Sequence, residues 1–281
     1  MDDISVILPK DALAGKLLAV SVSSSPDLGR LGLMDSHLRL VLGEVTRMVI
    51  LAGGQLGYGG HLEPSGYTAF LVSELYRYSR RDEPVKLFLS WDTHRVMDQE
   101  DLKDTIREYA LHAEVILLDR DGEQIGLEQR GRLLQSGQTD HDAQAALTAM
   151  RRFAVSRSDG QFLIGGARAD YKGRFPGVIE EAIFALNSGH PIYPAAGYGG
   201  ATFDVAKVVY GDLLDLDMPD ITAGKGLVDA LEALRQTLKE KGVPSTGLRP
   251  AEMKRLLCSY RPSEIASLVG CGLGRLASRL S

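Results

Sequence analysis

The chain has 281 residues, of which 44% are hydrophobic and 25% are charged, and its formal net charge is -5. This size and composition indicate one large globular domain, or one domain with an appendage, that buries a sizeable core. The acidic balance argues against binding of duplex nucleic acid, and the two cysteines, Cys258 and Cys271, give neither a disulfide framework nor a zinc-binding pattern.

The N-terminal segment is acidic and lacks a long apolar core, and no apolar run approaches the roughly 18–20 residues of a membrane helix. We therefore expect a cytoplasmic protein without membrane spans. Apolar periodicity, helix-start signals and glycine stops predict the elements along the chain. In chain order they are a strand at 16–23, helices at 35–51 and 68–78, a strand at 85–91, a helix at 101–110, a strand at 113–119, a helix at 140–155, a strand at 161–166, a helix at 176–189, a strand at 190–197, a helix from about 202, and helices at 227–239, 250–259 and 262–280.

Strands and helices alternate through about the first 210 residues, which is typical of a parallel sheet covered by helices on both faces. The predicted fold class is α/β: a Rossmann-like three-layer α/β/α domain with a mainly parallel sheet. The domain spans residues 1–215, and a helical C-terminal extension at 216–281 packs on it. That extension is either a cap that completes the core, which we favour, or a surface for a partner.

Glycine-rich or serine-rich segments follow several predicted strands, where ligands bind in open parallel sheets. The segment between the helices at 35–51 and 68–78 is interpreted as one loop that exposes backbone amides. Phosphate oxygens are suitable ligands for such amides and for serine hydroxyls. The candidate ligand-binding residues in these segments are Ser23, Ser24, Ser25, Gly53, Gly54, Tyr58, Gly59, Gly60, Gly66, Tyr67, Thr68, Gly165, Gly166, Gly197, Tyr198, Gly199 and Gly200.

The segment GGARADYKGRFPGVIEEAI, residues 165–183, combines cations, a helix start and two glutamates. Pro176 and Gly177 open the helix, whose free amides attract anions, and Arg168 and Lys172 could neutralise phosphate. Glu180 or Glu181 could accept hydrogen bonds from a ribose diol, although both could instead simply complement the helix dipole. Glu180 and Arg168 are the candidate catalytic residues, and no metal site is expected.

Four segments, SVSSSPDLGRLGL, LAGGQLGYGGHLEPSGYT, GGARADYKGRFPGVIEEAIFAL and PIYPAAGYGGAT, together resemble the SLOG superfamily. This superfamily includes the DprA/Smf proteins and the LONELY GUY enzymes. The resemblance covers roughly residues 14–212 and is strongest to a branch that occurs with TIR domains in bacterial conflict systems. LONELY GUY enzymes carry a P-G-G-x-G-T-x-x-E loop, and here only its ends match, at Pro176-Gly177 and Glu180-Glu181.

The resemblance implies a sensor of a nucleotide-derived ligand, such as an ADP-ribose-type or cyclic nucleotide signal, in antiviral defence. It also implies a possible effector protein as partner and a homo-oligomer. We expect that no cofactor is required. The alternative is a nucleotide N-glycoside hydrolase or transferase in which Glu180 acts at the sugar. A nucleic-acid-handling module like DprA is disfavoured by the acidic balance.

Overall fold

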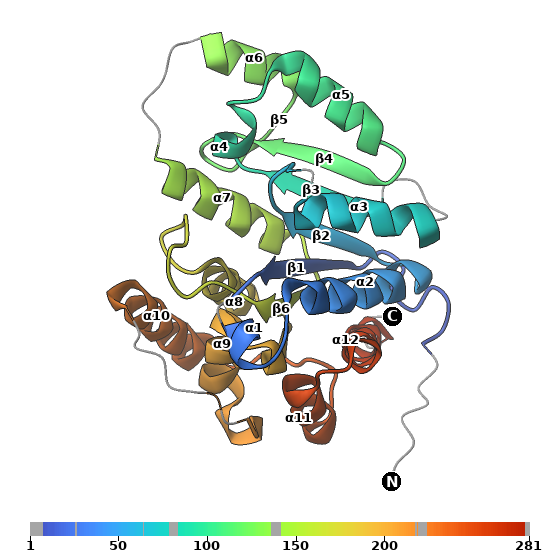
Figure 1. The fold of residues 1–281 in the computed structure, drawn as a ribbon, viewed down its shortest axis with the longest axis vertical. Helices are drawn as coiled ribbons and strands as arrows, with labels where there is room; N and C mark the ends of the chain where they lie inside the picture. Colours follow the sequence, from blue (N-terminus) through green and yellow to red (C-terminus); the bar gives the residue numbers. More distant parts are fainter. Residues whose placement is uncertain are drawn as a thin grey trace.

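The centre of the molecule is a mainly parallel β-sheet. The computed structural model describes residues 8–25, 27–63, 65–78, 84–135, 142–216, 218 and 224–278, and within these ranges seven strands form one sheet in the order β5-β4-β3-β2-β1-β6-β7. The strands are β1 (Leu17–Ser23), β2 (Gln55–Gly59), β3 (Val85–Leu89), β4 (Ala113–Leu118), β5 (Gln124–Ile125), β6 (Gly160–Gly165) and β7 (Ile192–Ala195). Every neighbouring pair is parallel except β4 and β5. The carboxyl ends of the parallel strands therefore share one edge, and the arrowheads of β1, β3 and β4 point the same way (Figure 1).

Helices cover both faces of this sheet. From β1 the chain passes through α2 (Asp35–Leu51) to β2 on one side, and from β6 it passes through α8 (Gly177–Asn187) to β7 on the other side. Because parallel crossovers are right-handed, steps in opposite directions put their helices on opposite faces. The remaining elements are α1 (Asp27–Arg30), α3 (Tyr67–Tyr78), α4 (Trp91–His94), α5 (Gln99–Tyr109), α6 (Leu127–Gln135), α7 (Ala143–Ser156), the 3₁₀ turns η1 (Ala196–Tyr198) and η2 (Gly211–Leu213), α9 (Gly200–Tyr210), α10 (Lys225–Lys241), α11 (Pro250–Cys258) and α12 (Pro262–Ser278). None of the helices in the described ranges is long and apolar enough to cross a bilayer.

Helix α2 forms where its apolar residues recur at helical spacing, because these residues pack into the core. Its residues Leu38, Leu42, Val45 and Val49 recur at helical spacing. They are fully buried in the main hydrophobic core, together with the even-numbered residues of β1. Burial of each such side chain contributes about 1.5–3 kcal/mol. On the opposite face, Leu17 of β1 packs with residues of α7, so the alternation of β1 side chains joins the two helical layers.

The C-terminal helices complete the same core. α12 packs against α2, and α11 packs against β7, the edge strand. Leu256, Leu257 and Val269 are fully buried in the main hydrophobic core. The Tyr193 hydroxyl of β7 also donates a hydrogen bond to the Thr246 carbonyl oxygen, at 3.0 Å. Residues 250–278 therefore cover a sheet edge that would otherwise be open.

An ion pair joins α11 to α12. The buried Glu252 carboxylate accepts hydrogen bonds from both terminal nitrogens of Arg275, at 2.6 and 3.0 Å, and also from Arg249. Hydrogen bonds from Arg275 hold the Glu252 pKa well below its ordinary value of 4.5. A depressed carboxyl pKa stabilises the folded state above the unfolded pKa, so this contribution is lost as the pH falls below about 4.5.

We expect Arg275→Met to lower the free energy of unfolding by about 2–3 kcal/mol at pH 7, because it leaves a buried carboxylate with only an exposed partner. The matched control is Arg255→Met, which removes an ion pair between the same two helices; Arg255 is 47% exposed and its partner Glu264 is 21% exposed. That control should cost less than about 1 kcal/mol. Urea denaturation at pH 7 and pH 4 measures both, and equal losses for the two variants would show that the Glu252 pair adds nothing.

The predicted fold class is confirmed: the sheet is mostly parallel, helices flank it, and helices follow at the C-terminus. The prediction of one loop across the first glycine cluster is wrong, because β2 runs through its middle, from Gln55 to Gly59. The short elements α1, α4 and β5, and also α6, were not predicted. Residues 140–141 and 279–280, at the ends of two predicted helices, lie outside the described residues, and so do residues 217 and 219–223 of the predicted C-terminal extension.

Candidate functional site

A cavity of about 360 Å³ opens over the carboxyl ends of β1 and β2. Its floor comes from residues 20–23 of β1, and its walls come from the β2–α3 loop, α7, the loop after β6 and the start of α8. Of the sequence-predicted residues, it is lined by Ser23, Tyr58, Gly59, Gly60, Tyr67, Lys172, Gly177 and Glu181. The cavity therefore lies at the sheet edge where open α/β folds bind ligands.

Glu181 supplies a carboxylate to this cavity from the first turns of α8. Its Oε2 atom accepts hydrogen bonds from the Ser21 hydroxyl and from Gln161 Nε2, the latter at 2.8 Å. The side chain is 15% exposed, and its Oε1 atom lies 3.7 Å from the Arg151 guanidinium. The strands thus fix one oxygen by hydrogen bonds, while the other lies beside Arg151 and keeps acceptor sites for a ligand.

The protonation of Glu181 is set by opposing effects. Burial raises its pKa from 4.5 to about 7, and the negative charge of Glu180 adds to the rise. Arg151 and the hydrogen bonds from Ser21 and Gln161 act in the other direction. The carboxyl group therefore changes its charge near neutral pH, which is the range in which a group can act as acid, base or pH-dependent ligand contact.

Glu180 lies outside the cavity. Its side chain is 3% exposed and points toward α7, where it accepts hydrogen bonds from Thr148 Oγ1 at 2.7 Å and from Arg151 Nη1 at 2.6 Å. Consecutive helical residues project about 100° apart, so only one of the two glutamates can face the ligand. The structure gives that position to Glu181, whereas the sequence favoured Glu180.

Arg151 of α7 is a cavity residue that the sequence reasoning missed. A Cβ atom at Gly177 would lie 2.6 Å from Arg151 Nη2, and one at Gly173 would also overlap the guanidinium. These two glycines thus leave room for the guanidinium to lie beside the start of α8. The signal in the sequence was the spacing, because Arg151 follows the inner-face residue Leu147 by one helical turn.

Arg168 also lies outside the cavity. It forms a bidentate ion pair with Asp204 of α9, at 2.5 and 3.0 Å, and a second ion pair with Asp27. Asp27 in turn accepts a hydrogen bond from the Gly200 backbone amide at 2.7 Å. The N-terminus of α9, where an anion could bind, is therefore already occupied by a carboxylate of the protein itself.

The glycine cluster after β7 is closed by packing. Gly199 and Gly200 adopt positive φ angles of 68° and 66°, and a Cβ at Gly200 would lie 2.5 Å from the Gly166 carbonyl oxygen. Gly197 packs against the Ser259 carbonyl, and the Tyr198 hydroxyl donates to the Tyr260 carbonyl oxygen at 3.0 Å. These glycines allow close approach of β6, α9 and the C-terminal segment, and they do not line the cavity.

Some of the remaining predicted residues lie at the amino ends of the strands, and others lie at the carboxyl ends, near the cavity. Gly53 and Gly54 precede β2, at the edge opposite the cavity, where Gly54 packs against Val49 and Leu13. Near the cavity, the Thr68 hydroxyl donates to the His61 carbonyl oxygen at 2.6 Å and holds the β2–α3 loop. Six further predicted residues do not line the cavity: Ser24, Ser25, Gly66, Gly165, Gly166 and Pro176.

Two tyrosines, Tyr58 and Tyr67, also line the cavity. The Tyr67 hydroxyl donates to Asp35, and Arg39 lies 5.0 Å from the Tyr67 ring centre. Burial and the nearby Glu181 charge raise the Tyr58 pKa, so its hydroxyl keeps its proton. Tyr58 therefore offers the cavity a neutral hydrogen-bond donor.

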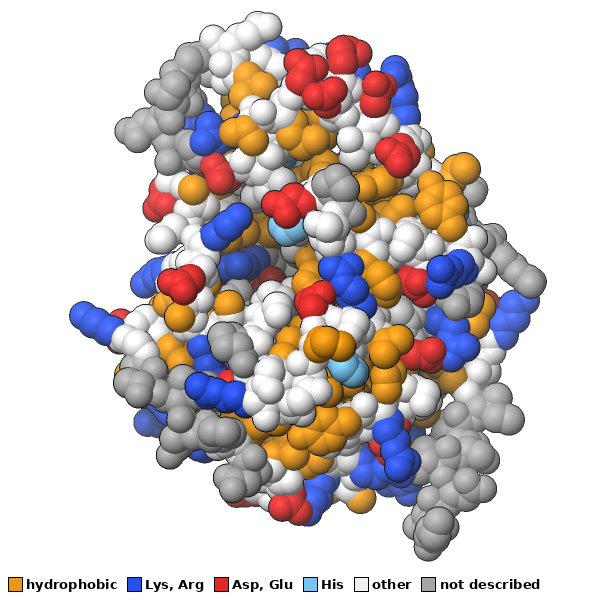
Figure 2. Space-filling view, viewed as in Figure 1, with side chains coloured by type: hydrophobic (Ala, Val, Ile, Leu, Met, Phe, Trp, Pro, Cys, Tyr) orange, Lys and Arg blue, Asp and Glu red, His pale blue; other side chains and the backbone are white. Residues whose placement is uncertain are grey.

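Side chains of both charges surround the mouth of the cavity. Arg151, Lys172, Asp170 and Glu181 line it. A second hollow along α7 is lined by three arginines and two aspartates: Arg120, Arg152, Arg174, Asp121 and Asp142. Figure 2 shows Lys and Arg side chains on both sides of the view, interspersed with Asp and Glu. Within the described ranges, no group of three or more His, Cys, Asp or Glu side chains is placed to bind a metal ion.

Comparison with known proteins agrees with this geometry. The SLOG cluster2 family model matches residues 12–241, which include every strand of the sheet and all of α7 and α8. No curated protein matches the chain. Membership of this family suggests binding of nucleotide-related ligands or a glycosidase-like activity. The sheet order, the cavity at its carboxyl edge and the extent of the match lead to one conclusion: the chain belongs to the SLOG cluster2 family.

Proposed function

We propose that the cavity over β1 and β2 binds the phosphorylated ribose of a nucleotide-derived ligand, and that the protein senses this ligand rather than consuming it. The observation that carries the proposal is the Glu181 carboxylate, which Ser21 and Gln161 hold at the cavity wall. A carboxylate with one fixed oxygen is a natural acceptor for the two hydroxyl groups of a ribose.

Groups suited to phosphate lie close to that carboxylate. Gly177 and Val178 line the cavity at the first turn of α8, where helix amides lack partners within the helix. Lys172 lines the same cavity and forms no ion pair with a described residue. A phosphate near the α8 start would therefore gain both amide hydrogen bonds and a positive charge, and Glu181 is left to the sugar.

The family suggests the ligand class to test first. An ADP-ribose-type or cyclic nucleotide signal contains both the ribose and the phosphate that the cavity groups match. Such a sensor would act in bacterial defence signalling through an effector partner, as its resemblance to conflict-system proteins implies.

A thermal-shift screen with AMP, NAD, ADP-ribose and cyclic ADP-ribose isomers tests the proposal. A ligand at a hundredfold excess over its Kd should stabilise the protein by about 2.7 kcal/mol. If none of these ligands raises the melting temperature, the proposed function is wrong. AMP without its ribose hydroxyls, as 2′,3′-dideoxy-AMP, is the matched control and should give a smaller shift.

The second candidate is N-glycoside hydrolysis, and the Glu181 pKa near 7 favours it, because a carboxyl group that changes charge near neutrality can activate water. Glu180 is held by Arg151 and Thr148, so it does not supply a second carboxylate in the cavity. Chromatography of the ligand mixtures after long incubation separates the two functions. Release of free base by the wild type and not by Glu181→Gln would establish turnover.

A further inference from the structure

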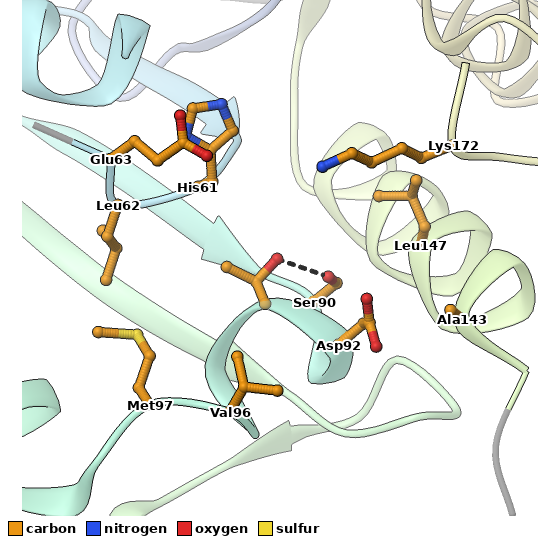
Figure 3. A pocket seen from close by; sticks show the side chains of 11 residues that line it. His61, Leu62, Glu63, Ser90, Asp92, Val96, Met97, Ala143, Leu147 and Lys172 are labelled. Atoms are coloured by element: carbon orange, nitrogen blue, oxygen red, sulfur yellow. Dashed lines mark hydrogen bonds and ion pairs between the residues drawn. The ribbon is translucent and has the colours of Figure 1, made fainter. Parts of the chain in front are cut away.

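A second chamber adjoins the ribose cavity. It has a volume of about 500 Å³ and lies beyond the carboxyl end of β3, between α4 and α7 (Figure 3). The two spaces share four wall residues, His61, Thr93, Leu147 and Lys172. A ligand seated in the first cavity could therefore extend into this second chamber.

The second chamber has apolar sides, a polar edge at residues 90–93, and two further polar side chains, His61 and Glu63, from the β2–α3 loop. Leu62 and Met97 lie on one side, and Leu147 lies on the other, on α7 (Figure 3). At the polar edge the Ser90 and Thr93 hydroxyls form a hydrogen bond of 3.0 Å, and the Asp92 side chain points into the space. Apolar walls with a few polar groups around them suit a flat heteroaromatic ring, whose faces are apolar and whose rim forms hydrogen bonds.

The far wall of this chamber is fixed in place by a buried arginine. Arg130 of α6 is 1% exposed, and its Nη2 atom donates to the carbonyl oxygens of His94 and Met97, at 2.7 and 2.6 Å. The His94 ring is itself buried and contacts the Leu118 carbonyl oxygen at 3.0 Å. The turn that carries Val96 and Met97 is thus tied to β4 and α6, so the chamber is formed before any ligand binds.

Lys172 lies at the junction of the two spaces. Its side chain extends from the loop before α8 toward the chamber and ends above Leu147 (Figure 3). It forms no ion pair with any residue in the described ranges. A cation at this junction, close to the α8 start, is placed to receive a phosphate that joins two parts of one ligand.

We propose that the ligand is extended and has two halves: a ribose held at Glu181 in the first cavity, a phosphate group at Lys172, and a second half with a heteroaromatic ring in the second chamber. This inference rests on the proposed function, because it takes the ribose position as its starting point. The inference predicts that dinucleotide-type ligands bind more tightly than mononucleotides. The two volumes fall in the range of about 300–1,000 Å³ that is typical of small-molecule sites.

The experiment compares AMP, ADP and NAD by isothermal titration calorimetry. We expect the wild type to bind NAD at least about tenfold more tightly than ADP, because only NAD can fill both spaces. Ala143→Trp, which adds bulk to the second chamber, should bring the ratio of the two affinities close to one. Ala145→Trp is the matched control, since Ala145 is an exposed residue of the same helix that lines neither space, and it should keep the wild-type ratio.

A charge variant tests the junction. Lys172→Met should weaken ADP and NAD about tenfold each, whereas Lys239→Met, on the exposed face of α10, should leave both affinities unchanged. Melting curves of all variants confirm that each remains folded.

The outcomes separate the inference from the proposed function. Equal affinities of AMP, ADP and NAD for the wild type would overturn the extended ligand and leave the ribose site intact. A wild-type ratio in Ala143→Trp would show that the second half of NAD lies elsewhere, which also overturns the inference. Failure of all three ligands to bind would reject both proposals together.

Discussion

Glu181→Gln is expected to weaken binding of ADP-ribose or NAD by about tenfold to a hundredfold at pH 8. The neutral amide keeps the shape of the side chain but removes the charge that strengthens hydrogen bonds from ligand hydroxyls, and such bonds contribute about 1.5–3 kcal/mol. Isothermal titration calorimetry measures the loss. Glu180→Gln is the informative neighbour, because Glu180 binds Arg151 and Thr148 outside the cavity. Glu180→Gln should lower the free energy of unfolding while leaving the affinity for ADP-ribose or NAD nearly unchanged. A loss of affinity without a loss of stability would instead assign the ligand-binding role to Glu180.

The same contact predicts a pH dependence. Since the pKa of Glu181 in the free protein is about 7, the carboxylate is mostly protonated at pH 6 and mostly charged at pH 8. Affinity for a ribose-containing ligand should therefore rise about tenfold between these values and then level off. The raised pKa has the opposite effect on the free protein, because the contribution of Glu181 to its stability should fall as the pH rises from 4.5 toward 7. In Glu181→Gln both trends should disappear, and an unchanged pH profile in that variant would assign the titration to another group.

Gly200→Ala is expected to destabilise the protein by about 3 kcal/mol or more, because it combines a positive φ with a steric clash. The φ angle is 66°, and the added Cβ would lie 2.5–2.6 Å from the carbonyl oxygens of Gly166 and Gly165. The backbone amide of Gly200 also binds Asp27, so any shift of this turn disturbs the Arg168 ion pairs.

Gly242→Ala provides the matched control for this second prediction. Gly242 has a similar φ of 72°, at the end of α10, but nothing lies within 4 Å of its added Cβ. This control should cost only about 1–2 kcal/mol, which is the strain of the left-handed conformation. Urea denaturation measures the free energy of unfolding of both variants, and the difference between them gives the cost of the steric clash without the cost of the positive φ. Equal losses would mean that β6 and α9 can move apart freely and that Gly200 is not required for their close approach.

The sequence predicted the layers of the fold because the strong signals were local. β1, β4 and β6 are apolar runs, and α2 repeats buried residues at helical spacing, so their state follows from their own composition. β2 was missed because its sequence, QLGYG, contains two glycines and has a weak strand propensity. Its strand conformation comes from pairing with β1 and β3 on both sides, and a side chain at Gly57 would crowd the Phe88 ring, at 3.1 Å.

The candidate site was predicted less completely, for two physical reasons. A shift of one residue at a helix start rotates every side chain by about 100°, so the motif could not decide between Glu180 and Glu181. The partners of Glu181 are also distant in the chain: Ser21 lies 160 residues earlier, and Gln161 lies 20 residues earlier. Arg168 was assigned to phosphate because its partners, Asp27 and Asp204, come from separate elements that only folding brings together.

The glycine clusters illustrate the same limit. Glycine was correctly associated with close backbone approach, but the approaching group differs between clusters. Gly59 and Gly60 line the cavity, whereas Gly200 approaches the backbone of β6. The amino-acid composition of a glycine cluster does not reveal whether the space beside it is filled by a ligand or by a neighbouring strand.

The most direct test of the account is a crystal structure of the protein with bound ADP-ribose. The account predicts a ribose hydroxyl within about 3 Å of the Glu181 carboxylate, with phosphate oxygens near Lys172 and the first amides of α8. Ligand bound at another edge of the sheet, or bound in this cavity with its ribose turned away from Glu181, would contradict it.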